Sequence, residues 1–185
     1  IGLSLVGSEM CIRDRSPGLS HSSLSTKRKL TIYAACVEST LLYSLHTSWL
    51  RQHELSRLNA FQARCLRKIL GIAHSYVSRV PNAEVLQRAR RTKLSDLLLQ
   101  RQLILFGDIA RKCNEHPVRQ VVFQPSSSDL TQQPSRRKRG RPRQAWASEL
   151  YKHAQRICRD IGCNIDNLGT FSAEAWKAAV RKYTV

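Results

Sequence analysis

The apolar residues of this chain recur every three to four positions, and this spacing restricts the fold more than any other feature of the sequence. An α-helix completes a turn in about 3.6 residues, so apolar side chains with this spacing lie on one helical face. No stretch shows the apolar–polar alternation that is typical of a β-strand. The sequence therefore predicts an all-α fold. One face of the first helix, from Lys27 to Trp49, would carry Leu30, Tyr33, Ala34, Val37, Leu41, Leu45 and Trp49.

The same spacing predicts further helices, and their ends coincide with residues that are typical of helix termini. The expected helices are 53–70 with Gly71 as its stop, 82–89 with Asn82 as its N-cap, one from Ser95 that frays by Asn114, 146–161 ended by Gly162, and one that begins at Ser172.

Changes in composition divide the chain into five segments. Val6 to Arg15 resembles the translation of a sequencing-library adapter, so we expect residues 1–15 to be a non-native leader and the native N-terminus to be missing. The expected organisation of the remainder is a flexible lead-in (16–26), a helical bundle (27–116), a Ser/Pro-containing and basic linker (117–143), and a small C-terminal helical lobe (144–185).

The charge balance indicates an acidic partner. Lys and Arg number 31 against 13 Asp and Glu, which gives a net charge of +18. Folding gains nothing from such an imbalance, and nucleic acid is the most common polyanion that neutralises it. A membrane partner is not expected, because no apolar run approaches about eighteen residues and the basic residues are scattered over several segments.

The densest basic run lies between Pro134 and Trp146. Six of the eight residues of 136–143 carry positive charge, and none of the eight is acidic. Gly140 lets a backbone approach a groove floor, and Pro142 favours an extended path. Each phosphate contact by such a run releases condensed counterions. The plainer interpretation is a solvated linker or a nuclear-import patch.

Two helical regions carry further basic clusters, one opposite the apolar face of helix 53–70 and one near residue 90. These clusters are typical of solvated helix faces, and with this net charge they are also candidates for phosphate contacts. The candidate nucleic-acid-binding residues are Arg57, Arg64, Arg67, Lys68, Arg88, Arg90, Arg91, Arg136, Arg137, Lys138, Arg139, Arg141 and Arg143.

No metal site or active site is predicted. Cys158 and Cys163 with His153, or Cys113 with His116, would be possible ligands, but neither set has a second matching pair at zinc-site spacing. The acids are spread singly and include no Asp-Asp pair that would hold a divalent ion for phosphoryl transfer. We therefore expect no catalytic residue and no cofactor, and the scattered cysteines suggest reduced thiols in an intracellular protein.

Four segments in order resemble the region that follows the polymerase core in non-LTR (LINE-type) retrotransposon reverse transcriptases. The family's "LLYG…W" motif is similar to Leu41-Leu42-Tyr43-Ser44 with Trp49, and its "Q-R-LR-ILGI" motif is similar to 62–72. Its Gly-His-ended helix is similar to 94–111, and its "GRPR–W" tail is similar to 139–146. Ser44 stands where Gly is usual, and Asp108 stands where His is usual.

The resemblance implies that the parent protein is an RNA-directed DNA polymerase and that this chain is its thumb-like and C-terminal part, intracellular and nuclear. The catalytic aspartates and their divalent metal would belong to a palm that is missing from this chain. The helices of 27–113 would hold a template–primer duplex (RNA–DNA hybrid or duplex DNA), and 136–143 would clamp nucleic acid near the target. The missing polymerase part of the same polyprotein would be a second partner.

Two other interpretations stay open. The run Arg139-Gly140-Arg141-Pro142 also matches an AT-hook, in which arginines enter the narrow minor groove of A·T-rich DNA, as in a chromatin or transcription protein. Alternatively, the chain is a transcribed relic that folds partly or not at all.

Overall fold

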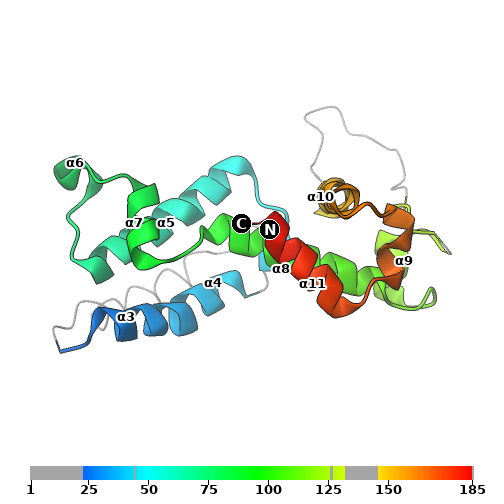
Figure 1. The fold of residues 1–185 in the computed structure, drawn as a ribbon, viewed down its shortest axis with the longest axis horizontal. Helices are drawn as coiled ribbons and strands as arrows, with labels where there is room; N and C mark the ends of the chain where they lie inside the picture. Colours follow the sequence, from blue (N-terminus) through cyan, green and yellow to red (C-terminus); the bar gives the residue numbers. More distant parts are fainter. Residues whose placement is uncertain (1–22, 44, 126, 132–145, 185) are drawn as a thin grey trace. The chain divides into compact units, whose positions relative to one another are not determined.

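The computed structural model describes residues 23–43, 45–125, 127–131 and 146–184, and within these residues the protein is all-α, as predicted (Figure 1). This part contains nine α-helices and no β-strand, and its one isolated β-bridge joins Phe123 and Leu130. The chain forms two compact units. Of the described residues, those up to Leu45 and 50–95 form unit 1, and those of 46–49 and from Asp96 onwards form unit 2.

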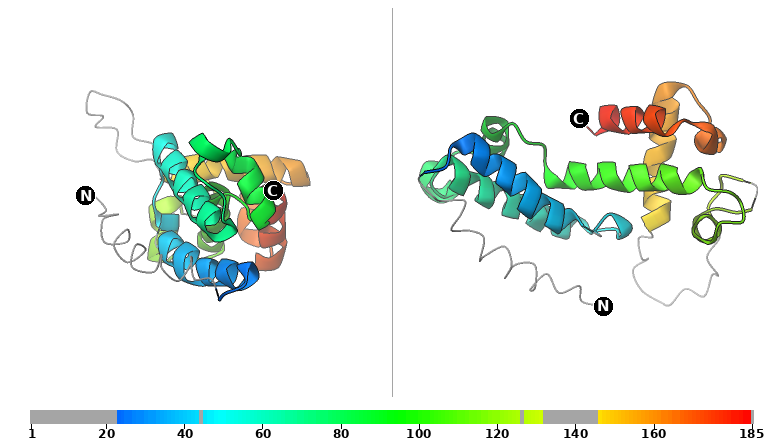
Figure 2. Two further views of the ribbon diagram at one scale, coloured as in Figure 1. Left: turned by 90° about the vertical axis from the view of Figure 1, so that its left-hand side faces the viewer. Right: turned by 90° about the horizontal axis from the view of Figure 1, so that it is seen from below.

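Unit 1 is built around α5, which packs against both α3 and α7 (Figure 2). Its elements are α3 (Thr26–Ile32), the π-helix η1 (Tyr33–Glu38), α4 (Ser39–Leu42), α5 (Gln52–Leu70), α6 (Ser75–Ser78) and α7 (Asn82–Ala89). The remaining elements are η2 (Leu45–Thr47), α8 (Leu94–Ala110), α9 (Pro117–Val122), α10 (Trp146–Ile161), η3 (Ile165–Thr170) and α11 (Ala173–Tyr183).

The first helical stretch is shorter than its apolar pattern predicts. Tyr33, Val37 and Leu41 are buried, as the pattern requires. The helix ends at Leu42, however, because Tyr43 adopts an extended backbone (ψ 129°). Trp49 therefore lies beyond the helix and belongs to unit 2, so the expectation of one helix to Trp49 was wrong.

Helix α5 confirms the second predicted helix at both ends. The backbone N–H of Arg51 donates to Glu54 Oε2 (2.6 Å), so the Glu54 side chain satisfies a free amide at the N-terminus. Gly71 ends the helix in the left-handed region (φ 68°), where a side chain would be strained. Ile72 N–H then donates to Arg67 O (2.9 Å), as in a Schellman motif.

Two predicted N-caps differ from the structure. Pro81, rather than Asn82, is the N-cap of α7. Helix α8 begins at Leu94, so Ser95 lies inside its first turn and is not the cap. Side chains of α5 satisfy the free amides there instead: Leu94 N–H donates to Gln62 Oε1 (3.0 Å), and Ser95 N–H donates to Asn59 Oδ1 (3.1 Å).

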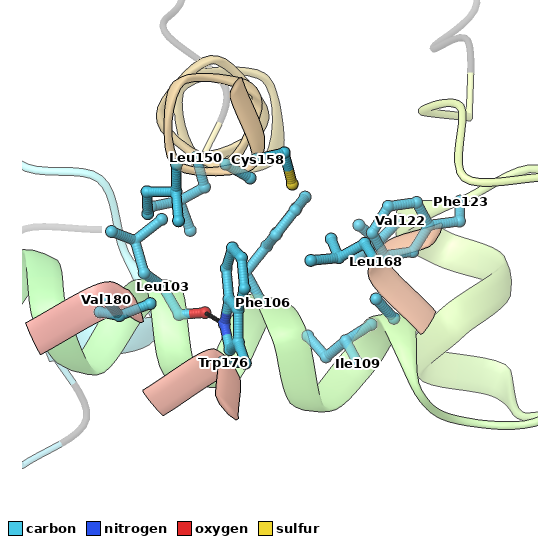
Figure 3. Close-up of a cluster of buried hydrophobic side chains, with 13 residues drawn as sticks. Leu103, Phe106, Ile109, Val122, Phe123, Leu150, Cys158, Leu168, Trp176 and Val180 are labelled. Carbon is cyan, nitrogen blue, oxygen red and sulfur yellow. Dashed lines mark hydrogen bonds between the residues drawn. The ribbon is translucent and has the colours of Figure 1, made fainter. Parts of the chain in front are cut away.

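Unit 2 is built around an apolar core that α8, α9, α10, η3 and α11 share (Figure 3). Trp176 is fully buried in it, and its indole Nε1–H donates to Leu103 O (2.8 Å). A Cβ atom at residue 107 would overlap Nε1 and Cδ1 of this indole, so Gly107 lets the ring approach the α8 backbone. The predicted helices at 146–161 and after Ser172 are confirmed, and Ser172 Oγ caps α11 by accepting from Ala175 N–H (3.1 Å).

The expected linker over 117–143 begins with a helix, α9, so that segment is not a linker throughout. Phe123 is buried beside Phe106, with ring centroids 5.2 Å apart. The Arg119 guanidinium is buried, donates to Ala110 O at the end of α8, and lies 5.3 Å from the centre of the Phe123 ring. These contacts tie α9 to the end of α8, and the sequence pattern of 117–131 did not indicate them.

Candidate nucleic-acid interface

Three cations form a line along the exposed side of α5. Arg57, Arg64 and Lys68 are exposed, and at about 100° per residue they fall within about 40° of one another around the helix axis. At about 1.5 Å per residue they span about 16 Å along it. We call these three residues the basic stripe. None of them has an ion-pair partner among the described residues, and the one acid of α5, Glu54, accepts from the backbone N–H of Arg51 at the start of the helix.

Arg67, which was expected to share this phosphate-facing role, is instead buried (5% exposed). Its Nη1 donates to Ala73 O and Ser78 Oγ (both 3.3 Å), and its Nη2 donates to Val80 O (2.5 Å) and Asn82 Oδ1 (3.0 Å). Charge-assisted hydrogen bonds of this kind are among the stronger ones in proteins. The guanidinium therefore holds the segment after α5 in place.

In the second predicted cluster, near residue 90, two of the three arginines contact other groups of the protein. Arg88 pairs with Glu84 one turn earlier on α7. Arg91 Nη2 donates to Leu30 O (3.0 Å), and its Nη1 lies 3.6 Å from a carboxylate oxygen of Glu38. Arg90 is exposed, takes a left-handed backbone (φ 51°) at the end of α7, and has no ion pair among the described residues.

The other predicted contacts, Arg136, Arg137, Lys138, Arg139, Arg141 and Arg143, lie outside the described residues.

The interior of unit 1 contains two buried titratable side chains close to the basic stripe, Cys65 of α5 and Tyr33 of η1. Burial raises the pKa of the Cys65 thiol to about 11, against smaller opposing effects of Lys68 and Arg64. Burial also raises the pKa of Tyr33, and the neighbouring Cys65 and Glu38 raise it further. The Tyr33 hydroxyl has no hydrogen-bond partner among the described residues. Both groups therefore keep their protons to a higher pH than an exposed thiol or phenol would.

A surface that the sequence analysis missed lies next to the C-terminal end of the basic stripe. In α6, Tyr76 is 81% exposed and Val77 is 62% exposed. The ring of His74 stacks on that of Tyr76, with centroids 5.8 Å apart and planes 11° from parallel. Nothing in the sequence indicates this surface, because Ile72 and Val80 lie four residues before and after Tyr76, and this spacing is typical of an apolar helical face with a buried ring.

The described residues contain no group of three His, Cys, Asp or Glu side chains that could hold a metal ion. Of the possible ligands, His116 instead accepts from Val118 N–H through Nδ1 (3.3 Å) and caps α9. Within the same residues, every helix is too short or too polar to cross a lipid bilayer.

Comparison with known proteins gives no assignment: no family model matches the chain, and no curated protein or solved structure is significantly similar to it.

Proposed function

We propose that this protein binds nucleic acid through contacts to the phosphate backbone. The observation that carries the proposal is the basic stripe, three exposed cations on one side of α5 without ion-pair partners among the described residues. Protein cations that are not neutralised by protein acids gain free energy from phosphates by releasing counterions. Such contacts position a duplex without reading its sequence.

The surroundings of the stripe support the same proposal. Residues 23–45 and 50–95 contain thirteen Lys and Arg against three Glu. One of these acids caps α5, and the other two lie against Arg88 and Arg91. The positive potential over α5 is therefore not cancelled by nearby carboxylates, and it would attract a polyanion from a distance as well as at contact.

In its more specific form, the proposal assigns the chain to the thumb-like and C-terminal part of a nuclear non-LTR retrotransposon reverse transcriptase. Four motifs in order support this form. The stripe would hold an RNA–DNA hybrid or duplex DNA, and Arg136 to Arg143 would make a second contact. The polymerase activity would belong to the parent protein, because this chain contains no paired aspartates.

The test compares two triple variants of the whole chain that remove the same charge. One neutralises the stripe (Arg57→Gln, Arg64→Gln, Lys68→Gln). The other neutralises three exposed arginines of unit 2 (Arg156→Gln, Arg159→Gln, Arg181→Gln). Fluorescence anisotropy with a labelled duplex over a series of salt concentrations gives the affinity and its salt slope.

The stripe variant is expected to bind at least about tenfold more weakly and to lose about 2.7 from the slope of log affinity against log salt, at about 0.9 per phosphate contact. The unit 2 variant should lose much less. Equal losses in the two variants would mean that only the net charge matters, and the stripe would not be the interface.

The Arg139-Gly140-Arg141-Pro142 run supports a second candidate, an AT-hook. It predicts a strong preference for A·T-rich over G·C-rich duplex and over an RNA–DNA hybrid, which the phosphate-contact proposal does not. Competition among the three probes separates the two candidates.

A further inference from the structure

The segment Ala73–Val80 presents two rings to solvent on a short, firmly held turn. Figure 1 shows α6 at the periphery of unit 1, joined to the C-terminal end of α5 by a short loop. Tyr76 and Val77 are two of the most exposed large apolar side chains among the described residues, and His74 stacks on Tyr76. Exposed aromatic groups cost solvation free energy, so a pair that is held in a stacked arrangement suggests a binding surface.

The backbone of this segment is fixed by polar contacts rather than by packing. The buried Arg67 guanidinium donates hydrogen bonds to Ala73 O, Ser78 Oγ and Val80 O. Ser78 Oγ in turn donates within the segment and lies 3.1 Å from both Ala73 O and His74 O. A segment held in this way loses little conformational entropy when a ligand binds, which favours binding.

The charge around the rings is positive. No acid occurs between Gly71 and Ala83, and Arg79 is exposed immediately after α6. Lys68 of the basic stripe lies in the last turn of α5, a few residues before the loop. Aromatic faces flanked by cations are the combination that binds unpaired bases in single-stranded nucleic acid, because every base has a π-face and a charged backbone.

We propose that His74 and Tyr76 form a base-stacking platform that takes an unpaired nucleotide at the end of a duplex, with Tyr76 making the main contact. The duplex itself would lie on the basic stripe, so this inference rests on the proposed function. The two parts differ chemically: the stripe recognises phosphates of any duplex, whereas the platform recognises the flat face of a base that has left the stack.

The test uses two probes, a blunt DNA duplex and the same duplex with a short single-stranded extension that carries 2-aminopurine as its first unpaired base. Wild-type chain is expected to bind the extended probe more tightly and to change the fluorescence of 2-aminopurine. Tyr76→Ala should weaken binding of the extended probe at least about fivefold. It should leave blunt-duplex affinity and the salt slope unchanged, because it removes no charge.

Tyr43→Ala is the matched control, because Tyr43 is also a highly exposed tyrosine of unit 1 (79%) but lies away from the segment in sequence, at the end of α4. It should keep the preference for the extended probe. Tyr76→Trp should also keep it, since an indole stacks at least as well as a phenol. Circular dichroism should show the same helical signal in all three variants.

The outcomes separate the two proposals. If wild-type chain binds neither probe, the proposed function fails. If it binds both probes equally, or if Tyr76→Ala behaves like Tyr43→Ala, the duplex contact stands and the platform is wrong. If Tyr76→Ala changes only the self-association of the free chain in sedimentation, the rings form a protein contact, and the platform is again wrong.

Discussion

The two units use their charged residues in different ways. In unit 1, residues 23–45 and 50–95 carry thirteen Lys and Arg against three Glu. The described residues of unit 2 carry ten against eight, and include the neighbouring pairs Glu149–Lys152 (2.9 Å) and Glu174–Lys177 (3.1 Å). The described residues of unit 2 are thus close to charge balance, and the basic excess of this unit lies in the run 136–143, whereas unit 1 carries its excess among its described residues.

The interiors are more alike than the charge counts. Unit 2 has a large apolar cluster around Trp176, and it also buries Arg119, whose guanidinium donates to Ala110 O. Unit 1 buries Arg67, whose guanidinium takes part in four hydrogen bonds. Arginine count alone therefore does not measure a binding surface: in unit 1 some arginines are structural and others are available to a ligand.

The largest effect is expected in the apolar interior of unit 2. Trp176→Ala removes a fully buried indole together with its hydrogen bond to Leu103, and it should cost about 3–5 kcal/mol of the free energy of unfolding. Urea denaturation gives the total, and hydrogen exchange should place the loss in α10 and α11. Ile161→Ala, at a partly exposed position of α10, is the control and should cost well under half as much. Similar costs for the two variants would mean that the Trp176 cluster does not hold unit 2.

The next effect separates structural from available arginines in unit 1. Arg67→Met keeps the apolar stem but leaves the carbonyls of Ala73 and Val80 without their charged donor, so it should cost about 2–3 kcal/mol of stability. Arg64→Met, three residues earlier and exposed, should change stability by no more than about 0.5 kcal/mol. It should, however, weaken duplex binding. Urea denaturation should show a loss of stability mainly in Arg67→Met, and anisotropy should show a loss of duplex affinity in Arg64→Met. If the two variants lose stability equally, the distinction between the two arginines is wrong.

Local signals predicted much of the fold, and contacts between distant segments explain what they missed. Gly71 and Ser172 mark helix ends through their own backbone and side-chain chemistry, so the ends of α5 and α11 could be read from the sequence. A helical wheel places Arg67 at the edge of the basic stripe. It holds no information on residues 73–82, whose carbonyl, hydroxyl and amide oxygens turn Arg67 inward.

The same reasoning applies to the first helix and to Trp49. The apolar spacing continues beyond Leu42, but the helix ends there. Segment 46–49 belongs to unit 2 and is held by two hydrogen bonds: Gln102 Nε2–H donates to Ser48 O (2.7 Å), and Trp146 Nε1–H donates to His46 O (2.9 Å). A periodic pattern cannot distinguish one long helix from a shorter helix followed by a tryptophan that packs elsewhere. The basic stripe was predictable because Arg57, Arg64 and Lys68 lie opposite the apolar face of α5, whereas the exposed Tyr76 depends on a turn that Arg67 stabilises.

The last effect is a dependence of stability on pH, and it appears only in alkaline solution. The pKa of the Cys65 thiol rises on folding from 9.0 to about 11, so the folded state holds its proton more tightly than the unfolded state. The stability that this group contributes is complete below pH 9 and is lost as pH rises towards about 11. The loss amounts to roughly 2–3 kcal/mol at about 1.4 kcal/mol per pH unit. Tyr33, whose pKa is also raised, adds to the loss above about pH 10.

The contribution of unit 1 can be separated from that of unit 2, because all three tryptophans (Trp49, Trp146 and Trp176) belong to unit 2. Circular dichroism follows helices of both units, whereas tryptophan fluorescence follows unit 2, where burial also raises the pKa of Cys158. In the double variant Cys65→Ala, Tyr33→Phe, the alkaline decline of stability seen by circular dichroism should shrink while the fluorescence transition keeps its pH dependence. If the pH dependence of the circular dichroism signal and that of the fluorescence signal change by the same amount in this variant, alkaline unfolding does not start from Cys65 and Tyr33. The two units would then not differ in how proton release is linked to their unfolding.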